Sequence, residues 1–194
     1  PARLSWLTGL APSQMGVTRN TVAEAPEDAP SMFRTLQQQG WHTALIGKTH
    51  WTNHRDPTDL RHTQARIQSL GFDRVLEIAG PKALRHVRCA LTDTWEQEGW
   101  MEPYVDDMRQ RYGSAEGSRA WAVRPSVLPD ALYPDLWLTG KGLEALHRMP
   151  TKQPWLLWIS FVGPHEPFDT PKSWRESTPH LTPDPLPAGD WIAN

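Results

Sequence analysis

Two segments of the chain each combine apolar residues at helical spacing with a short apolar run of strand length that follows. In the first, Ser31 caps a helix that ends at Gly40, and residues 43–46 form the apolar run. In the second, leucines at helical spacing mark residues 135–147, and residues 155–162 form the most apolar run in the chain. Continuously apolar runs of this length are typical of strands buried on both faces. The pattern therefore predicts two helix–strand units.

The remaining segments have weaker patterns. Residues 1–9 are expected to form a short helix, residues 11–30 a surface loop, and residues 75–78 a short strand that follows a glycine turn. Residues 80–130, approximately, are interpreted as a peripheral insertion of helices and loops. In residues 170–194 proline recurs so often that no regular structure is expected there.

This order of helices and apolar strands predicts an α/β fold with a mainly parallel central sheet. The length of 194 residues fits one domain. Gly47 ends the first apolar run, so Lys48 and His50 should emerge at the carboxyl edge of a strand, and His165 should follow the second run in the same way. Ligands of open α/β sheets bind at that edge.

Composition narrows the possible partners. Hydrophobic residues make up 38% of the chain, the mean hydropathy is −0.59, and no apolar run approaches the ~20 residues of a membrane span. A net charge of −2 and a pI near 6.5 argue against a general nucleic-acid binder, so any anion site must be local. Cys89 is the single cysteine, which excludes an internal disulfide and a cysteine-rich zinc site.

Four basic side chains are candidates for a site that binds and transforms an oxyanion. Arg3 lies in the first turn of the expected N-terminal helix, where a forked guanidinium beside unpaired N–H groups suits a doubly charged anion. Lys48 offers a point charge, while His50 and His165 can donate hydrogen bonds or transfer protons near neutral pH. Cleavage of an oxyanion ester needs such groups, because negative charge builds on the ester oxygen as the bond breaks. As structural alternatives, a strand-end lysine is most often only solvated, and His165 can brace a proline turn.

Three elements of the sequence resemble the sulfatase family, and they occur in the family's order. The opening Pro-Ala-Arg-Leu-Ser-Trp-Leu-Thr-Gly-Leu at 1–10 is similar to the end of the sulfatase signature, Cys-x-Pro-x-Arg followed by Leu-Thr-Gly. Gly-Lys-Thr-His at 47–50 is similar to the family's Gly-Lys-x-His, and Gly-Pro-His-Glu-Pro at 163–167 to its Pro-His-x-Pro. The resemblance covers most of the chain outside roughly 80–130. It implies a partial alkaline-phosphatase-like α/β/α sandwich, with 1–194 as a single incomplete catalytic domain.

The resemblance also implies a catalytic role for each of the four basic residues. Arg3 would hold the hydrate of formylglycine, the nucleophile that family members make by oxidising the signature cysteine or serine. Lys48 would contact the sulfate and the nucleophile, and His165 would bind the sulfate or assist the leaving group. His50 would act as a base when the covalent hemiacetal sulfate breaks down. The implied reaction is attack by the hydrate on sulfur, release of the alcohol, and elimination of sulfate that regenerates the aldehyde.

Other parts of the family's site are expected to lie outside this chain. The modified cysteine or serine would fall two residues before Pro1, so the chain is interpreted as an internal fragment that is inactive alone. Cys89 lacks the Pro and Arg of the signature and is not taken as the modified residue. Family members bind a divalent cation, usually Ca²⁺, through oxygen ligands of which none is assigned here. The adjacent Asp106 and Asp107 stay unassigned because they fall in the wrong order along the chain.

Two other functions stay open at this point. A phosphonate or phosphate ester hydrolase of the same superfamily would use similar groups, and a non-catalytic homologue would bind sulfated glycans without cleaving them. For a sulfatase, the expected partners are a sulfated small molecule or glycan and the enzyme that generates formylglycine. Loop residues His54, Glu166 and Asp169 are further candidates for substrate contact. The sequence leaves the compartment open between the cytoplasm and the periplasm or exterior of a bacterium.

Overall fold

The computed structural model describes residues 1–19, 24–26, 28–54, 58–112 and 124–178. Three strands form the sheet: β1 His42–Gly47, β2 Arg74–Glu77 and β3 Trp155–Ser160. Seven α-helices lie in the described residues: α1 Ala2–Thr8, α2 Met32–Gln38, α3 Gln64–Gln68, α4 Ala90–Gln97, α5 Met101–Tyr112, α6 Pro134–His147 and α7 Lys172–Ser177. Two short 3₁₀ helices, η1 Ala83–Arg85 and η2 Asp130–Leu132, complete the described elements. In that part of the chain, no helix has the length and apolar character needed to cross a membrane.

The sheet is parallel, with the strand order β2-β1-β3. In its register, Gly47 at the end of β1 lies opposite both Glu77 of β2 and Ser160 of β3. The carboxyl ends of all three strands therefore lie side by side. This arrangement confirms the prediction of an α/β fold with a mainly parallel central sheet.

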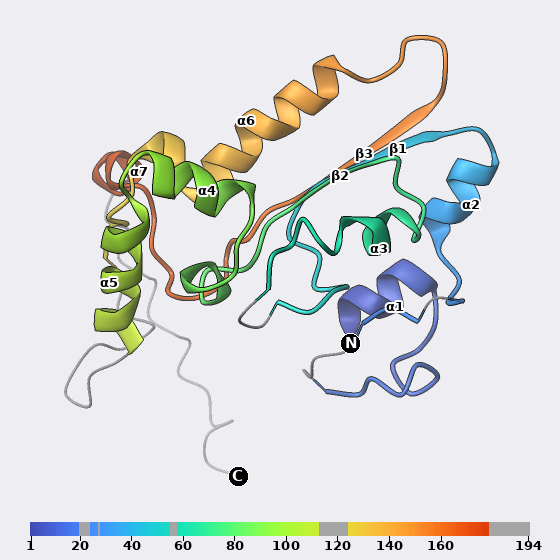
Figure 1. The fold of residues 1–194 in the computed structure, drawn as a ribbon, viewed down its shortest axis with the longest axis horizontal. Helices are drawn as coiled ribbons and strands as arrows, with labels where there is room; N and C mark the ends of the chain where they lie inside the picture. Colours follow the sequence, from blue (N-terminus) through green and yellow to red (C-terminus); the bar gives the residue numbers. More distant parts are fainter. Residues whose placement is uncertain (20–23, 27, 55–57, 113–123, 179–194) are drawn as a thin grey trace, which may run out of the picture.

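Helices cover both faces of the sheet, with α6 on one face and α1, α2 and α3 on the other (Figure 1). The two faces are separated by alternation along β1. Leu45 belongs to the core formed with α1, α2 and α3, whereas Ile46 belongs to the core formed with α4, α5 and α6. Because successive side chains of a strand point to opposite faces, one apolar run can fill both cores. The layers are those of an α/β/α sandwich.

Aromatic rings fill the core beneath α1 and α2. Phe33 is fully buried, with its ring centroid 4.3 Å from that of Phe72 and 5.0 Å from that of Trp158. Trp6 of α1 meets Trp158 edge-on at 4.1 Å. Aromatic pairs in tilted and edge-to-face geometry gain stability beyond the area that they bury. This packing fixes α1, and with it the first turn that carries Arg3, against the strands.

Residues 80–112 form η1, α4 and α5, in agreement with the helices and loops expected there. Trp95 and Tyr104 are buried with their ring centroids 4.4 Å apart, and Leu138 of α6 belongs to the same apolar cluster. These helices thus share a core with the sheet. The interpretation of 80–130 as an insertion stays a prediction, and residues 113–123 lie outside the described residues.

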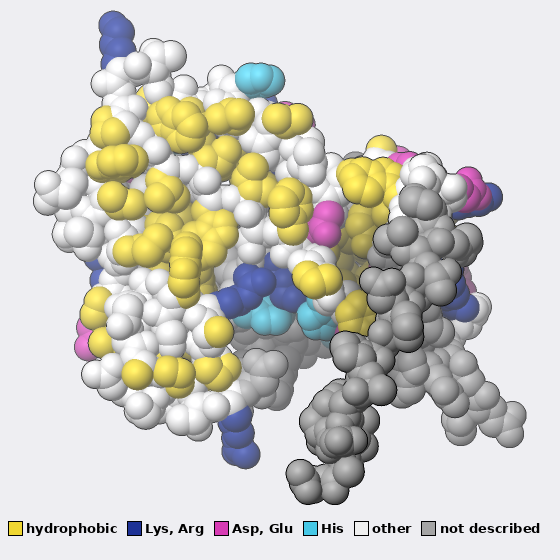
Figure 2. Space-filling view, turned by 180° about the vertical axis from the view of Figure 1, so that it is seen from behind, with side chains coloured by type: hydrophobic (Ala, Val, Ile, Leu, Met, Phe, Trp, Pro, Cys, Tyr) yellow, Lys and Arg dark blue, Asp and Glu magenta, His cyan; other side chains and the backbone are white. Residues whose placement is uncertain are grey.

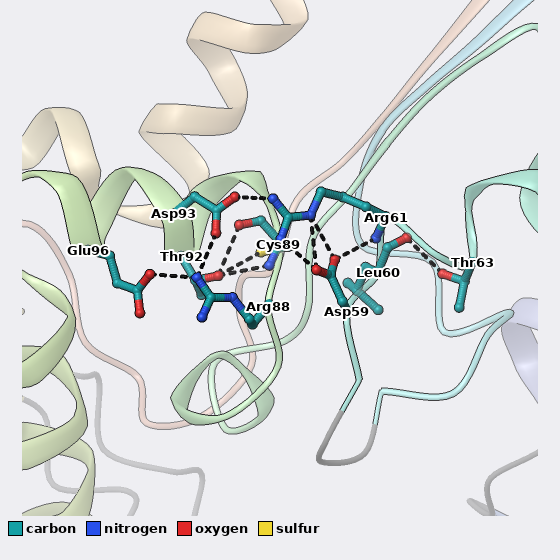
Figure 3. Close-up of polar contacts among 9 residues, drawn as sticks. All are labelled: Asp59, Leu60, Arg61, Thr63, Arg88, Cys89, Thr92, Asp93 and Glu96. Atoms are coloured by element: carbon teal, nitrogen blue, oxygen red, sulfur yellow. Dashed lines mark hydrogen bonds and ion pairs between the residues drawn. The ribbon is translucent and has the colours of Figure 1, made fainter.

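A network of exposed ion pairs joins the segment before α3 to α4 (Figure 3). Arg61 pairs with Asp59 and with Asp93 of α4. Arg88 extends the network, with a distance of 2.6 Å between its Nη2 and Oε2 of Glu96. Exposed pairs of this kind contribute little individually. Together they connect the segment that carries Asp59 and Arg61 to α4.

The structure corrects two boundaries expected from the pattern. Strand β3 ends at Ser160, two residues before the apolar run ends, because the next residues turn toward α6. The short helix α7 occupies part of the proline-rich segment that was expected to lack regular structure. Pro171 directly precedes α7, and proline is compatible with the start of a helix even though it interrupts the middle of one. Residues 179–194 lie outside the described residues.

Candidate functional site

A cavity of about 730 Å³ opens at the carboxyl edge of the sheet. Its wall includes all four of the basic residues predicted for the site: Arg3, Lys48, His50 and His165. They come from α1, from the end of β1 and from the turn after β3. On the surface drawn in Figure 2, lysine or arginine side chains and histidine side chains gather at one place beside a broad hydrophobic area.

Arg3 is tied to the ends of two strands. Its Nη1 donates to the carbonyl oxygen of Lys48 at 2.7 Å and to Oγ of Ser160 at 3.2 Å. The carbonyl oxygen of Arg3 in turn accepts from Nε1 of the buried Trp51 at 3.1 Å. Partial burial lowers the pKa of Arg3, but a guanidinium stays charged at neutral pH. The cation is therefore held in place before any ligand binds.

Lys48 is the residue directly after β1, and only 4% of it is exposed. Its backbone N–H donates to the carbonyl oxygen of Ser160 at 3.0 Å, which continues the strand pairing. Its ammonium lies over Gly80, where an added Cβ would come within 2.8 Å of Nζ. Burial first, and then the charge of Arg3, lower the pKa of Lys48 to about 8, although Asp135 acts in the opposite direction.

His50 sits in the left-handed region of backbone conformation, with φ of 59°. A non-glycine residue in this region is unusual and marks a backbone held by its surroundings. The residue keeps an exposed surface, yet its pKa is lowered to about 3, first by desolvation and then by the charges of Lys48, His54, Arg3 and His165. His50 is thus neutral at physiological pH and has a lone pair available to accept a proton.

His165 lies in an exposed turn that α6 positions. The carboxylate of Asp135 accepts the backbone N–H of Val162 at 2.7 Å and that of Gly163 at 3.1 Å. Nδ1 of His165 lies 2.7 Å from the carbonyl oxygen of Glu166. If that nitrogen carries the hydrogen, Nε2 is left to face a ligand. No local pattern predicted this role of Asp135, because it depends on a helix start and a strand end that are distant in the chain.

A second lysine, Lys82, lies on the cavity wall and pairs with Glu166 of the turn that carries His165. Its Nζ also lies 4.7 Å from the ring centroid of Tyr112. The ion pair lowers the pKa of Glu166. Of the loop residues expected as candidates for substrate contact, Glu166 therefore makes an ion pair at the cavity wall, and the carbonyl oxygen of Asp169 accepts from the hydroxyl of Tyr133 at 2.9 Å.

His54, the third of those loop residues, reaches a buried carboxylate that sequence reasoning missed. Nε2 of His54 lies 2.9 Å from Oε1 of Glu77, and Thr52 donates to Oε2 of the same carboxylate at 3.0 Å. Thr49 also donates to Glu77. A signal was present in principle, since Glu77 ends β2 at the same sheet edge as Lys48. A single glutamate after a short strand does not stand out by itself.

The described residues do not assemble a metal centre. No group of three or more His, Cys, Asp or Glu side chains in the described part of the chain could hold a metal ion. Asp107 instead pairs with Arg111 and Arg124, and Asp106 pairs with Arg109. The cavity wall carries cations, which do not suit a bound Ca²⁺. The residues present therefore do not fit a calcium site by themselves.

Cys89 does not line the cavity. It is fully buried at the start of α4, where its backbone N–H donates to Oγ1 of Thr92 at 2.8 Å. Burial raises the pKa of its thiol, which opposes formation of a reactive thiolate. The exclusion of Cys89 as the modified residue stays a prediction.

Taken together, the cavity offers fixed positive charge and a neutral imidazole at a strand edge. Arg3 and Lys48 supply charge-assisted donors in a partly desolvated site, where such donors act more strongly than in water. His50 supplies a proton acceptor, and His165 a further donor or acceptor. A tetrahedral dianion or monoanion fits this set, and a cation does not.

Comparisons with known proteins agree with this geometry. The family model described as Sulfatase matches residues 1–185. The chain is 25% identical over 193 residues to an arylsulfatase of Clostridium perfringens, a match that covers 98% of this chain and 38% of that protein. It is 28% identical over 197 residues to a choline-sulfatase of Rhizobium meliloti, covering 95% of this chain and 33% of that protein. The chain thus spans between a third and two fifths of the length of these relatives.

Two solved structures share the fold. A phosphonate monoester hydrolase of Agrobacterium radiobacter superposes with a TM-score of 0.55 at 21% identity, covering 91% of this chain and 33% of that one. A phosphonate monoester hydrolase of Silicibacter pomeroyi gives a TM-score of 0.51 at 18% identity, covering 91% and 34%. At these identities the likeness supports the alkaline-phosphatase-like fold and does not distinguish between substrates.

Proposed function

The chain belongs to the sulfatase family, and on that premise we propose that the protein containing it, called the parent protein below, hydrolyses sulfate esters. One observation carries the proposal. Arg3, Lys48, His50 and His165 come from three separate segments and line one cavity at the carboxyl edge of the sheet. The named relatives, an arylsulfatase and a choline-sulfatase, support the same class of substrate.

Each residue has a proposed task that follows from its surroundings. Lys48 and Arg3 hold the sulfate oxygens and stabilise the charge that develops as the ester bond breaks. His50 is neutral and accepts a proton from a hydroxyl group in the cavity. His165 lies in the turn after β3, which lines the same cavity, and donates to a sulfate oxygen or to the leaving alcohol oxygen.

The proposal includes two groups that this chain does not supply. A formylglycine made from a cysteine or serine before Pro1 supplies the nucleophile, and a separate maturation enzyme generates it. A Ca²⁺, as expected for the family, would need oxygen ligands that the described residues do not supply. The described residues bind and orient the sulfate group.

Parallel assays of the parent protein test the substrate class. An aryl sulfate, an aryl phosphonate monoester and an aryl phosphate monoester with the same leaving group would be compared at equal enzyme concentration. We expect kcat/KM to be highest for the sulfate. A higher value for the phosphonate or phosphate would favour the alternative hydrolase. Binding of a sulfated glycan without any turnover would favour the non-catalytic alternative.

The pKa of Lys48 predicts the alkaline limit of activity. Because that pKa is about 8, the ammonium loses its proton as the pH rises through 8, so kcat/KM should fall above this value. Lys48→Arg should move the decline to higher pH, because a guanidinium stays protonated there. Lys82→Arg is the matched control and should leave the pH at which kcat/KM declines unchanged. A wild-type profile that stays flat to pH ~10 would contradict this assignment.

A further inference from the structure

Glu77 is a buried carboxylate directly beneath the proposed site. Its side chain is 0% exposed, and it accepts hydrogen bonds from Thr49, Thr52 and His54, which all follow β1. Among the described charged-pair contacts of Glu77, the only partner is the imidazole of His54. A buried carboxylate with three donors is well satisfied, and its position is fixed.

This contact also fixes which nitrogen of His54 carries hydrogen. The oxygens of Glu77 act as acceptors for both threonine hydroxyls, so Nε2 of His54 donates its hydrogen to Oε1 at 2.9 Å. In the neutral imidazole, Nδ1 is then a bare acceptor. The side chain is only 7% exposed, and Nδ1 is buried with no hydrogen-bond partner. An unpaired buried acceptor is costly and calls for an explanation.

The ring of the proposed base lies close to the ring of His54. The centroids of His50 and His54 lie 5.1 Å apart, with an angle of 85° between the ring planes. Both residues line the cavity. The backbone of His50 is in the left-handed region, which indicates that its surroundings hold that backbone in place. A rotation of the His50 ring about its own axis can aim a ring N–H at its neighbour, because that torsion is soft.

We propose that Glu77 and His54 are positioning residues for His50: Glu77 fixes the tautomer of His54, and Nδ1 of His54 accepts a hydrogen bond from the ring of His50. This inference rests on the proposed function, because it assigns His50 the role of base. His50 keeps the proton that it accepts from the reacting hydroxyl group, and no proton is transferred to His54 or Glu77. The hydrogen bond orients the second nitrogen of His50, with its lone pair, toward the reacting hydroxyl group.

The charges around His50 show what such an acceptor adds. Burial lowers the pKa of His50 most, and the neighbouring Lys48, His54, Arg3 and His165 lower it further. An imidazolium that forms in such a field is stabilised when its other N–H has an acceptor. Among the described groups facing His50, His54 is the one whose carboxylate partner turns a ring nitrogen into such an acceptor.

Two substitutions of His54 separate the two nitrogens in the parent protein. His54→Gln keeps a donor near the position of Nε2 for Glu77 but has no acceptor at the position of Nδ1. His54→Asn places an amide oxygen near the position of Nδ1 but loses the donor to Glu77. We expect His54→Gln to lower kcat for a sulfate ester by about 10- to 100-fold, with KM changed by less than about threefold. His54→Asn should be at least about fivefold more active than His54→Gln.

The reverse order would show that His54 serves only to satisfy Glu77, and that result would overturn the inference. Equal activity of both variants would overturn it as well. His62→Gln and His62→Asn are matched controls, since His62 is exposed and lies outside the cavity wall, and both should retain wild-type kcat.

A measurement without turnover keeps the inference separate from the proposed function. In ¹⁵N-histidine-labelled wild-type protein, the ring nitrogens of His54 should show the tautomer protonated at Nε2. The Nδ1 resonance should shift in His50→Phe. If the wild type cleaves no sulfate ester, the proposed function fails, while these spectra still test the contact. A tautomer protonated at Nδ1, or an Nδ1 resonance that ignores His50→Phe, would overturn the contact itself.

Discussion

Replacing Lys48 by alanine is expected to lower kcat/KM of the parent protein for a sulfate ester by about 100- to 1,000-fold, the effect of losing one oxyanion-stabilising donor. Its ammonium is buried beside Arg3 and lies over Gly80, so water cannot replace it easily. The loss should appear in kcat as well as in KM, because the charge on the ester oxygen grows toward the transition state.

Two other lysines serve as comparisons for this effect. Lys82 lines the same cavity, but Glu166 partly neutralises its charge, so Lys82→Ala should reduce kcat/KM by less than about tenfold. Lys141 lies on α6, pairs with Glu144 and is absent from the cavity wall, so Lys141→Ala should match the wild type. Steady-state kinetics on the three alanine variants would show whether the loss of kcat/KM is specific to Lys48. If Lys48→Ala stayed within about threefold of the wild type, the proposed sulfate contact would be wrong.

Much of the fold follows from local sequence patterns. The apolar run that became β1 predicted a buried strand, and Gly47 predicted its end, because these depend on neighbouring residues alone. The parallel order of the strands follows from the helices between them. With the strand ends known, Lys48 and His165 were expected at one edge, and the structure brings both to one cavity. Their roles in catalysis stay predictions.

The contacts that the sequence did not predict join residues distant in the chain. Glu77 ends a four-residue strand, and nothing near it indicates that three donors from the loop after β1 converge on its carboxylate. Asp135 presents the same difficulty, because it binds backbone N–H groups 27 and 28 residues later. For this reason, His54 was expected only as a candidate for substrate contact, and its contact with Glu77 was not predicted. Burial and pairing of polar groups are decided by tertiary packing, which a local pattern does not contain.

Gly47→Ala is expected to destabilise the protein by about 3–5 kcal/mol, because two separate costs add at this residue. Gly47 has φ of +117°, a conformation that side chains rarely adopt. A Cβ there would lie 2.0 Å from the carbonyl oxygen of Ser160, so the backbone of β1 or β3 must move. That carbonyl accepts the N–H of Lys48, and a shift would displace the lysine from the cavity.

Gly40→Ala separates the steric cost from the conformational one. Gly40 also has a positive φ, +83°, but an added Cβ would have no neighbour within 4 Å. This substitution should cost only about 1–2 kcal/mol, the penalty for a left-handed residue. Denaturant unfolding of the two variants and the wild type gives the free energies of unfolding. Equal losses in both variants would mean that the contact between Gly47 and Ser160 relaxes freely, and the strand end would then be a less rigid support for Lys48 than its hydrogen bonds indicate. A clearly larger loss in Gly47→Ala than in Gly40→Ala, together with reduced sulfate ester hydrolysis in the folded Gly47→Ala variant, would link the close packing of β1 and β3 to the position of Lys48.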